Sequence, residues 1–253
     1  MKFDKFLRAV APVAAMALAA GLAGCKDATI SINDEDGVPL AELDQSGDPP
    51  KELVLAGPDS VVVTSGKKLT IAVEGDPRAV EALRFTFKDG TLGVLRQSGL
   101  KDMDKTQATV RVTMPAPERI VIAGSGGVAA QGMARIAEVV IAGSGRLDLA
   151  YADVETLDVN VVGSGTFGAA GKAKALDLTV AGAGSMEAAG LEVDEAKVAI
   201  VGSGDAEFAS DGTVKAKIMG SGDVTVTGSA TCTIEAMGSG KVTCRPAAPA
   251  EQK

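Results

Sequence analysis

The sequence repeats one short motif, an apolar stretch followed by Gly-Ser-Gly, seven times, and the copies begin 18 to 20 residues apart. A period near 20 residues is typical of a solenoid, in which each repeat buries its apolar face only against neighbouring repeats. It therefore predicts one elongated body. The motif residues, with Ala183 in place of one serine, are Gly124, Ser125, Gly126, Gly143, Ser144, Gly145, Gly163, Ser164, Gly165, Gly182, Gly184, Gly202, Ser203, Gly204, Gly220, Ser221, Gly222, Gly238, Ser239 and Gly240.

Apolar and polar residues alternate on both sides of the motif, as in strands with one buried face. Before the motif, the aligned inward positions are Ile122, Ile141, Val161, Val180, Ile200 and Ile218, with a second inward column of Ile120, Val139, Val159, Leu178, Val198 and Ile234. The outward positions include Arg119, Glu138, Asp158, Asp177, Lys197 and Lys215.

Each repeat thus reads as one coil: a strand, the Gly-Ser-Gly corner, a second strand and a second corner. The second corners are expected at small residues such as Gly171, Gly190, Gly212 and Gly228. Glycine suits a corner that needs a positive φ or a close approach between stacked backbones. We predict an all-β fold, a single-stranded parallel β-helix with coils of about 20 residues.

The first 24 residues are typical of an export signal. Lys2, Lys5 and Arg8 precede the apolar run 9–20, which is short for a membrane span, and Leu-Ala-Gly-Cys ends at Cys25. This resembles a bacterial lipoprotein signal peptide, in which the cysteine is lipidated and becomes the mature N-terminus. The alternative is an ordinary secretory signal with a chance cysteine. Lys26 is not the aspartate associated with inner-membrane retention in enteric bacteria, which favours the outer membrane.

The rest of the chain divides by composition. Residues 25–50 are polar and acidic, and we expect a disordered tether with a reach of roughly 25 to 30 Å. Residues 51–118 are less regular than the repeats and should form the cap or first coils, residues 119–245 the repeat β-helix, and residues 246–253 a short disordered tail.

The chain is acidic, with 33 Asp and Glu against 25 Lys and Arg and a formal charge of −8. Removal of residues 1–24 takes away three basic residues and one acidic residue, which gives −10 for the mature chain. No basic stripe offsets this charge, so nucleic acid is not expected as a partner.

Residues 51–244 resemble the head GIN-domain proteins, a bacterial family described as putative auto-transporter adhesins of the cell envelope. The likeness rests on the repeated Gly-Ser-Gly and on three N-terminal sections, 53–58, 73–76 and 89–92. It implies a right-handed single-stranded β-helix and no established enzyme activity. Independently, Asp89-Gly90 predicts a tight turn between strands, and 60–63 and 69–74 read as further strands.

Two motifs suggest chemistry that their context does not support. Residues 119–129 look like a strand entering a dinucleotide-binding glycine turn, but the pattern recurs at about 20 residues where a βαβ unit needs about 30, so no cofactor is predicted. The repeated serines lack a histidine base, since the chain contains none. We expect them to be small corner residues whose hydroxyls bond the backbone of a neighbouring coil.

A glycan-binding or glycan-processing enzyme is the alternative function, because parallel β-helices often act on polysaccharides. Such chemistry needs paired carboxylates or a calcium cluster. Asp148, Asp205, Glu207 and Asp223 lie on the outer face, but a column of outward acids more often serves solubility and protection of strand edges. Aromatic residues form only 3% of the chain, which weighs against stacking on sugars.

Three cysteines are present. With Cys25 assigned to lipid, Cys232 and Cys244 remain as an even pair in an oxidising compartment, both at inward positions of the last coil. We predict a disulfide between them; the alternatives are two free thiols or a metal pair. No metal site is predicted.

Together these features predict a lipid-anchored cell-envelope protein whose β-helix presents a surface for binding, as an adhesin-like or scaffolding module without catalysis. The expected partners are the membrane, through the N-terminal lipid, and an envelope glycan or protein.

Overall fold

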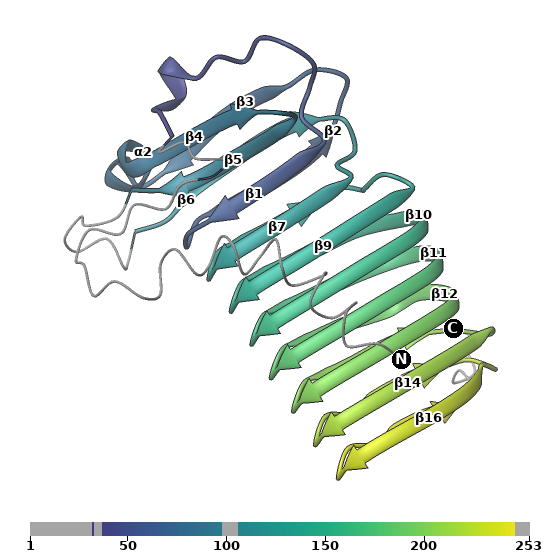
Figure 1. Cartoon of the computed structure of the whole chain (residues 1–253). Coiled ribbons are helices and arrows are strands. Elements are labelled where there is room, and N and C mark those ends of the chain that lie inside the picture. The colour runs from purple at the N-terminus through teal and green to yellow at the C-terminus, as the bar shows by residue number, and fades with distance from the viewer. Residues whose placement is uncertain (1–31, 33–36, 98–105, 246–253) are drawn as a thin grey trace, which may run out of the picture.

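The computed structural model describes residues 32, 37–97 and 106–245, which form a β-solenoid of stacked parallel coils (Figure 1). The elements in chain order are η1 (Leu40–Glu42), β1 (Glu52–Ala56), β2 (Ser60–Ser65), β3 (Thr70–Gly75), α2 (Pro77–Ala82), β4 (Leu83–Lys88), β5 (Thr91–Arg96), β6 (Ala108–Met114), β7 (Arg119–Gly124), β8 (Gly127–Ala130), β9 (Ile136–Gly143), β10 (Arg146–Gly163), β11 (Thr166–Gly182), β12 (Ser185–Gly202), β13 (Asp205–Ala209), β14 (Thr213–Gly220), β15 (Val224–Thr227), β16 (Thr231–Gly238) and β17 (Val242–Arg245). No helix in these described ranges is long and apolar enough to cross a membrane.

The coils form two walls that meet at the Gly-Ser-Gly corners. The pre-corner wall consists of β1, β7, β9, the second parts of β10, β11 and β12, then β14 and β16. The post-corner wall consists of β2, β8, the first parts of β10, β11 and β12, then β13, β15 and β17. All these neighbours are parallel and in register, so equivalent residues form straight columns along the molecule.

The core lies between the two walls, and the predicted inward columns are confirmed. The column from Ile122 to Ile218 is fully buried, as are Phe167 and Phe208. The final coil is different, because no further coil covers it. Ile234, which was predicted to point inward, lies in the expected register but is 47% exposed.

The corner glycines are needed for two reasons. The first glycine of each motif has a positive φ, such as 126° at Gly202, and the third has an ordinary φ but lies very close to the preceding coil. A Cβ on Gly204 would be 2.3 Å from the carbonyl oxygen of Gly184. Among the predicted second corners, Gly171 and Gly228 have positive φ, and Gly212 is required by close contact with Asp194.

The prediction that the corner serine hydroxyls bond the backbone of a neighbouring coil is wrong; the hydroxyls of Ser221 and Ser239 instead lie 3.3 Å from each other. The backbone N–H of Ser203 donates to the carbonyl of Gly182 at 2.8 Å, and Ala183 makes the same bond to Gly163 at 2.8 Å. All the corner serine side chains are exposed. Because the main chain carries the bond between coils, the side chain can be replaced by alanine, as it is at residue 183.

The N-terminal end of the solenoid is covered by a cap. Strands β5 and β6 continue the two walls beyond β1 and β2, and β4 and β3 then pair with them in antiparallel fashion. The predicted turn between β4 and β5 is confirmed, with positive φ at Asp89 and Gly90. Asp76 caps the N-terminus of helix α2, and its carboxylate accepts a hydrogen bond from the backbone N–H of Arg78 at 2.9 Å.

The segment 37–50 is packed on this cap, so the prediction of a disordered tether is wrong for these residues. Val38 exchanges backbone hydrogen bonds with Phe85 at the edge of β4, and Leu40 and Leu43 pack against the core. The contacts of these three apolar residues order the segment although the residues around them are acidic. Ile32 is also buried. The predicted signal peptide 1–24, Cys25 and the tail 246–253 lie outside the described residues.

The predicted disulfide is present. Cys232 of β16 and Cys244 of β17 are bonded across the last coil, with their Cα atoms 6.8 Å apart and a sequence separation of 12. Cys232 packs against the core, while Cys244 is exposed because it lies at the open end. The bond closes the final coil where no neighbour supports it.

Candidate functional site

The outer face of the post-corner wall contains a broad groove of about 640 Å³. It spans β2, β8 and the first parts of β10, β11 and β12. Its outward positions are small, with Ala129, Ala150, Gly168 and Ala170 in adjacent coils, and this lack of side-chain volume hollows the face. The groove is thus produced by side-chain size on a rigid wall rather than by a loop.

A network of three charged residues crosses the groove. The Nε of Arg146 donates to Asp148 at 2.9 Å, and its Nη1 donates to Glu187, two coils away, at 3.0 Å. Gly168 lies beneath the network, where a Cβ would be 2.6 Å from Asp148 Oδ1. The hydrogen bonds that Arg146 donates to Asp148, and then to Glu187, raise the pKa of Arg146 above its ordinary value.

These three side chains are about half exposed, with solvent-accessible fractions of 49%, 52% and 58%. Ion pairs at such exposure add little to stability. The network is nevertheless held in place by two coils and presents both signs of charge within one apolar hollow. This arrangement suits recognition of a partner that carries charges of its own.

The other acidic residues considered for catalysis have structural partners. Asp205 Oδ1 accepts the backbone N–H of Asp223 at 2.8 Å, and Asp223 Oδ1 accepts that of Lys241 at 2.8 Å. These bonds continue the connection between coils. Nearby, the backbone N–H of Ser229 and then its hydroxyl lower the pKa of Asp211 in the same manner.

Within the ranges 37–97 and 106–245, and at residue 32, no group of three or more His, Cys, Asp and Glu side chains could hold a metal ion. Glu207 is exposed on the same wall and lies in register with Glu187. Of the four acidic residues considered from the sequence, Asp148 lines the groove, whereas Asp205 and Asp223 accept backbone N–H groups of the next coil.

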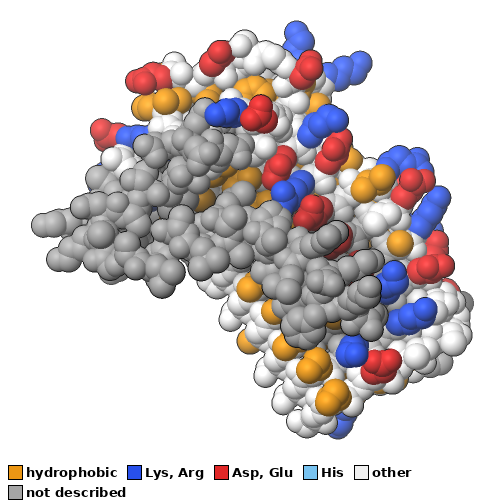
Figure 2. Space-filling view, viewed as in Figure 1, with side chains coloured by type: hydrophobic (Ala, Val, Ile, Leu, Met, Phe, Trp, Pro, Cys, Tyr) orange, Lys and Arg blue, Asp and Glu red, His pale blue; other side chains and the backbone are white. Residues whose placement is uncertain are grey.

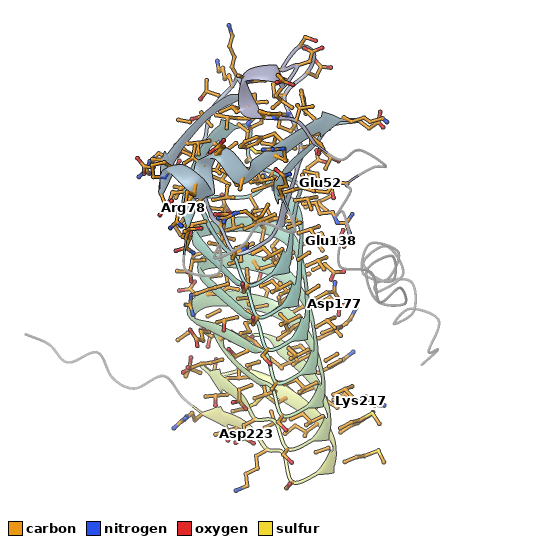
Figure 3. All side chains as sticks on the ribbon, turned by 90° about the vertical axis from the view of Figure 1, so that its left-hand side faces the viewer. Glu52, Arg78, Glu138, Asp177, Lys217 and Asp223 are labelled. Carbon is orange, nitrogen blue, oxygen red and sulfur yellow. A yellow bond between two sulfur atoms is a disulfide. The ribbon has the colours of Figure 1, made fainter. Side chains whose placement is uncertain are left out.

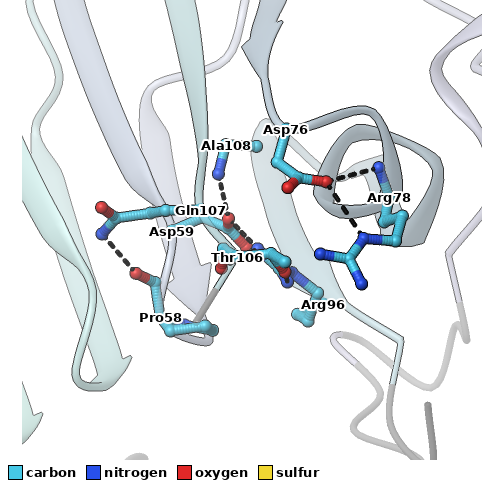
Figure 4. Close-up of polar contacts among 8 residues, drawn as sticks. All are labelled: Pro58, Asp59, Asp76, Arg78, Arg96, Thr106, Gln107 and Ala108. Atoms are coloured by element: carbon cyan, nitrogen blue, oxygen red, sulfur yellow. Dashed lines mark hydrogen bonds and ion pairs between the residues drawn. The ribbon is translucent and has the colours of Figure 1, made fainter. Parts of the chain in front are cut away.

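A buried ion pair between the cap and the first coil was not found from the sequence (Figure 4). Arg96 at the end of β5 binds Asp59, whose side chain is 1% exposed, through two of its nitrogens. Asp59 also accepts the backbone N–H of Ala108 at 2.8 Å, and Gln107 binds the carbonyl of Pro58. Asp59 takes the position of the third corner glycine, so this network holds the cap to the first corner.

Residues 49–230 match the model of the family described as putative auto-transporter adhesin, head GIN domain. No curated protein sequence matches the chain.

Several solved structures share the fold. A protein of Bacteroides fragilis described as a putative adhesin is 21% identical, with a TM-score of 0.70 over 79% of this chain and 93% of that one. A putative lipid binding protein of Parabacteroides distasonis is 19% identical, with a TM-score of 0.60 over 79% and 94%. A putative adhesin of Parabacteroides merdae is 18% identical, with a TM-score of 0.58 over 79% and 93%. At these identities the likeness concerns the fold alone.

Proposed function

Since this chain belongs to the family of putative auto-transporter adhesins with a head GIN domain, we propose that it is a binding protein of the bacterial cell envelope and not an enzyme. The groove on the post-corner wall is the surface that would hold the partner. The observation that carries this proposal is the Arg146 network, which fixes charges of both signs over an open apolar hollow.

The shape and composition of the groove favour an extended polypeptide partner. It runs across successive coils, and half of its lining residues are alanine or valine. Its lining residues include no aromatic side chain, and sugar-binding sites commonly use aromatic rings for stacking. A polypeptide with paired charges could exchange ion pairs with Arg146, Asp148 and Glu187, whereas an envelope glycan would have to bind without stacking.

Anchoring is the second part of the proposal. The signal sequence and Cys25 favour a lipid-modified N-terminus, and the absence of aspartate at residue 26 favours the outer membrane. Replacement of Cys25 by alanine should abolish labelling with a palmitate analogue and release the protein from the membrane fraction. If the variant still took up the palmitate analogue and remained in the membrane fraction, lipidation at Cys25 would be contradicted.

Binding can be tested with two exposed alanines. Ala150→Trp fills the groove, and Ala189→Trp adds the same side chain on β12 outside it. We expect the full chain to bind envelope proteins or whole cells, and Ala150→Trp to weaken that binding at least about tenfold, which is typical for blocking the centre of an interface. Equal loss or equal retention by both variants would show that the groove is not the site. Binding to purified glycans alone would favour the glycan partner.

A further inference from the structure

We propose that the outer face of the pre-corner wall, at coils β12, β14 and β16, lies against the surface of the bilayer and contacts its phospholipid headgroups. The proposal rests on lipidation of Cys25, which belongs to the proposed function. It concerns the wall opposite the groove. Figure 3 shows Glu52, Glu138, Asp177 and Lys217 along one edge of the molecule, which is this outer face.

An apolar row runs along this face beside the corners. In every coil from β7 onward, the outward residue immediately before the first glycine of the corner is apolar, and these residues are in register. Figure 2 shows the lower part of this row. The row consists of Ala123, Ala142, Val162, Ala181, Val201, Met219 and Met237.

The row is most exposed at its C-terminal end. Val201, Met219 and Met237 are 44%, 46% and 67% exposed. Single exposed apolar residues are ordinary on protein surfaces, but these three lie on successive coils about 4.8 Å apart. Such a contiguous strip is suited to contact with an apolar or interfacial medium.

Three lysines lie beside this strip in a chain that is acidic overall. Lys197, Lys215 and Lys217 are exposed on β12 and β14, and Lys217 pairs with Glu235 at 3.1 Å. Lys197 and Lys215 are direct neighbours across the two strands, and neither forms an ion pair with a residue in the described part of the chain. Like charges in such positions destabilise a sheet. Anionic headgroups would relieve this repulsion.

The acidic residues on the same face limit the contact to the C-terminal coils. Glu138, Asp158 and Asp177 occupy the column that Lys197 and Lys215 continue. Glu195 and Glu235 are the carboxylates on β12 and β16 at outward positions of this wall. An anionic membrane surface would repel coils β9 to β11 and attract the lysine-bearing coils that follow.

The position of Ile32 brings the anchor to this face. Ile32 is buried in a cluster with Val54, Val121 and Val140, which are outward residues of β1, β7 and β9. Cys25 is seven residues earlier, so at full extension it lies within roughly 25 Å of Ile32. Four coil steps separate Val140 from Lys217, or about 19 Å. The lysine-bearing coils of this face therefore lie within the reach of a lipid on Cys25.

Depth measurement on the mature lipoprotein tests the proposal. The protein is reconstituted in vesicles of phosphatidylethanolamine and phosphatidylglycerol and carries a spin label through Met219→Cys. The control label is attached through Glu207→Cys on the opposite wall. We expect the label at 219 to collide with oxygen more than with a water-soluble nickel chelate, and the label at 207 to show the reverse. Equal access of the chelate to both labels would overturn the proposal.

A charge variant provides the second measurement. Lys197→Gln, Lys215→Gln and Lys217→Gln together should expose the label at 219 to the chelate, because each lysine near an anionic surface changes the equilibrium about fivefold. Lys172→Gln, Lys174→Gln and Lys241→Gln remove the same charge elsewhere and should have no effect. If protection of the label at 219 from the chelate increased with the density of protein in the vesicles, this face would contact a second copy of the chain, and the proposal would be overturned.

The outcomes separate this proposal from the binding function. Loss of partner binding by Ala150→Trp does not alter label depth, and an aqueous label at 219 does not alter partner binding. If the wild-type chain takes up no lipid and does not associate with vesicles, the orientation proposal fails together with the anchor, while the groove remains testable.

Discussion

Replacement of Gly202 by alanine should strongly destabilise the central coils. Gly202 has a φ of 126°, and a Cβ there would lie 2.2 Å from the carbonyl oxygen of Gly182. That oxygen accepts the backbone N–H of Ser203 at 2.8 Å. The alanine therefore introduces a rarely occupied backbone conformation and a clash that can be relieved only by separating the two coils at this hydrogen bond.

The magnitude follows from these two effects. A non-glycine residue in such a region of φ and ψ costs about 1 to 3 kcal/mol. Loss of a backbone hydrogen bond whose partner stays unsatisfied costs about 1 to 3 kcal/mol. We expect Gly202→Ala to lower the free energy of unfolding by about 2 to 6 kcal/mol.

Two controls isolate the cause. Ser203→Ala removes an exposed hydroxyl from the next residue and should change stability by about 0.5 kcal/mol or less, as Ala183 suggests. Gly127→Ala places a Cβ 3.8 Å from its nearest neighbour, with no positive φ, and should be tolerated.

Urea denaturation followed by far-ultraviolet circular dichroism measures the global change. Hydrogen exchange shows which coils open, since solenoid coils can unfold separately. If Gly202→Ala is as stable as Gly127→Ala, the argument from close approach and positive φ is refuted.

Three further predictions concern other parts of the molecule. Arg96→Met should lower the free energy of unfolding by about 3 to 5 kcal/mol, because it leaves the buried carboxylate of Asp59 without a partner. Arg111→Met, which breaks an exposed pair with Glu74, should lower it by about 1 kcal/mol or less in the same denaturation assay. Equal effects would contradict the structural role of the buried pair. The double variant Cys232→Ser, Cys244→Ser removes a crosslink over 12 residues that stabilises the protein by roughly 3 kcal/mol at most. Hydrogen exchange should increase in β16 and β17 more than in β10 to β12. An equal increase in all these strands would contradict a local role for the disulfide. Burial, then the charges of Asp177 and Glu138, raise the pKa of Asp158, so ionisation of Asp158 opposes folding at neutral pH. This penalty disappears as the pH falls below the ordinary pKa of aspartate, so Asp158→Asn should stabilise the protein by a few tenths of a kcal/mol at pH 7 and not at pH 3. A loss of stability at pH 7 would contradict this sign.

The repeating part of the fold was predictable because its physical signals recur. The alternation of residues such as Ile141 and Glu138 is set by the two faces of a strand, and stacking fixes the period of the glycines. The disulfide followed from the same columns, since Cys232 and Cys244 lie on the two walls of one coil. Each inference used several copies of one pattern.

The cap and the candidate site could not be predicted in this way. Arg96 and Asp59 are 37 residues apart and occur once, so no periodicity connects them. The groove depends on the absence of a side chain at Gly168 beneath an arginine on the preceding coil, a relation between coils that is invisible along the chain. The composition of segment 37–50, which is acidic with few apolar residues, led to the wrong prediction of disorder. Val38, Leu40 and Leu43 all contact the cap.

The matching register of successive coils makes the length of this molecule an adjustable quantity. Between Gly163 and Gly182 both walls pair with equivalent positions one coil later, and the register shifts only near the second corner, between Gly168 and Ala170, so removal of residues 164–182 would join strands that already fit. The cap and the crosslinked last coil would be unchanged, and their separation would shorten by one strand spacing of about 4.8 Å. Duplication would lengthen it by the same step. Genetic gain or loss of whole repeats could therefore tune how far the body extends while leaving both of its ends intact.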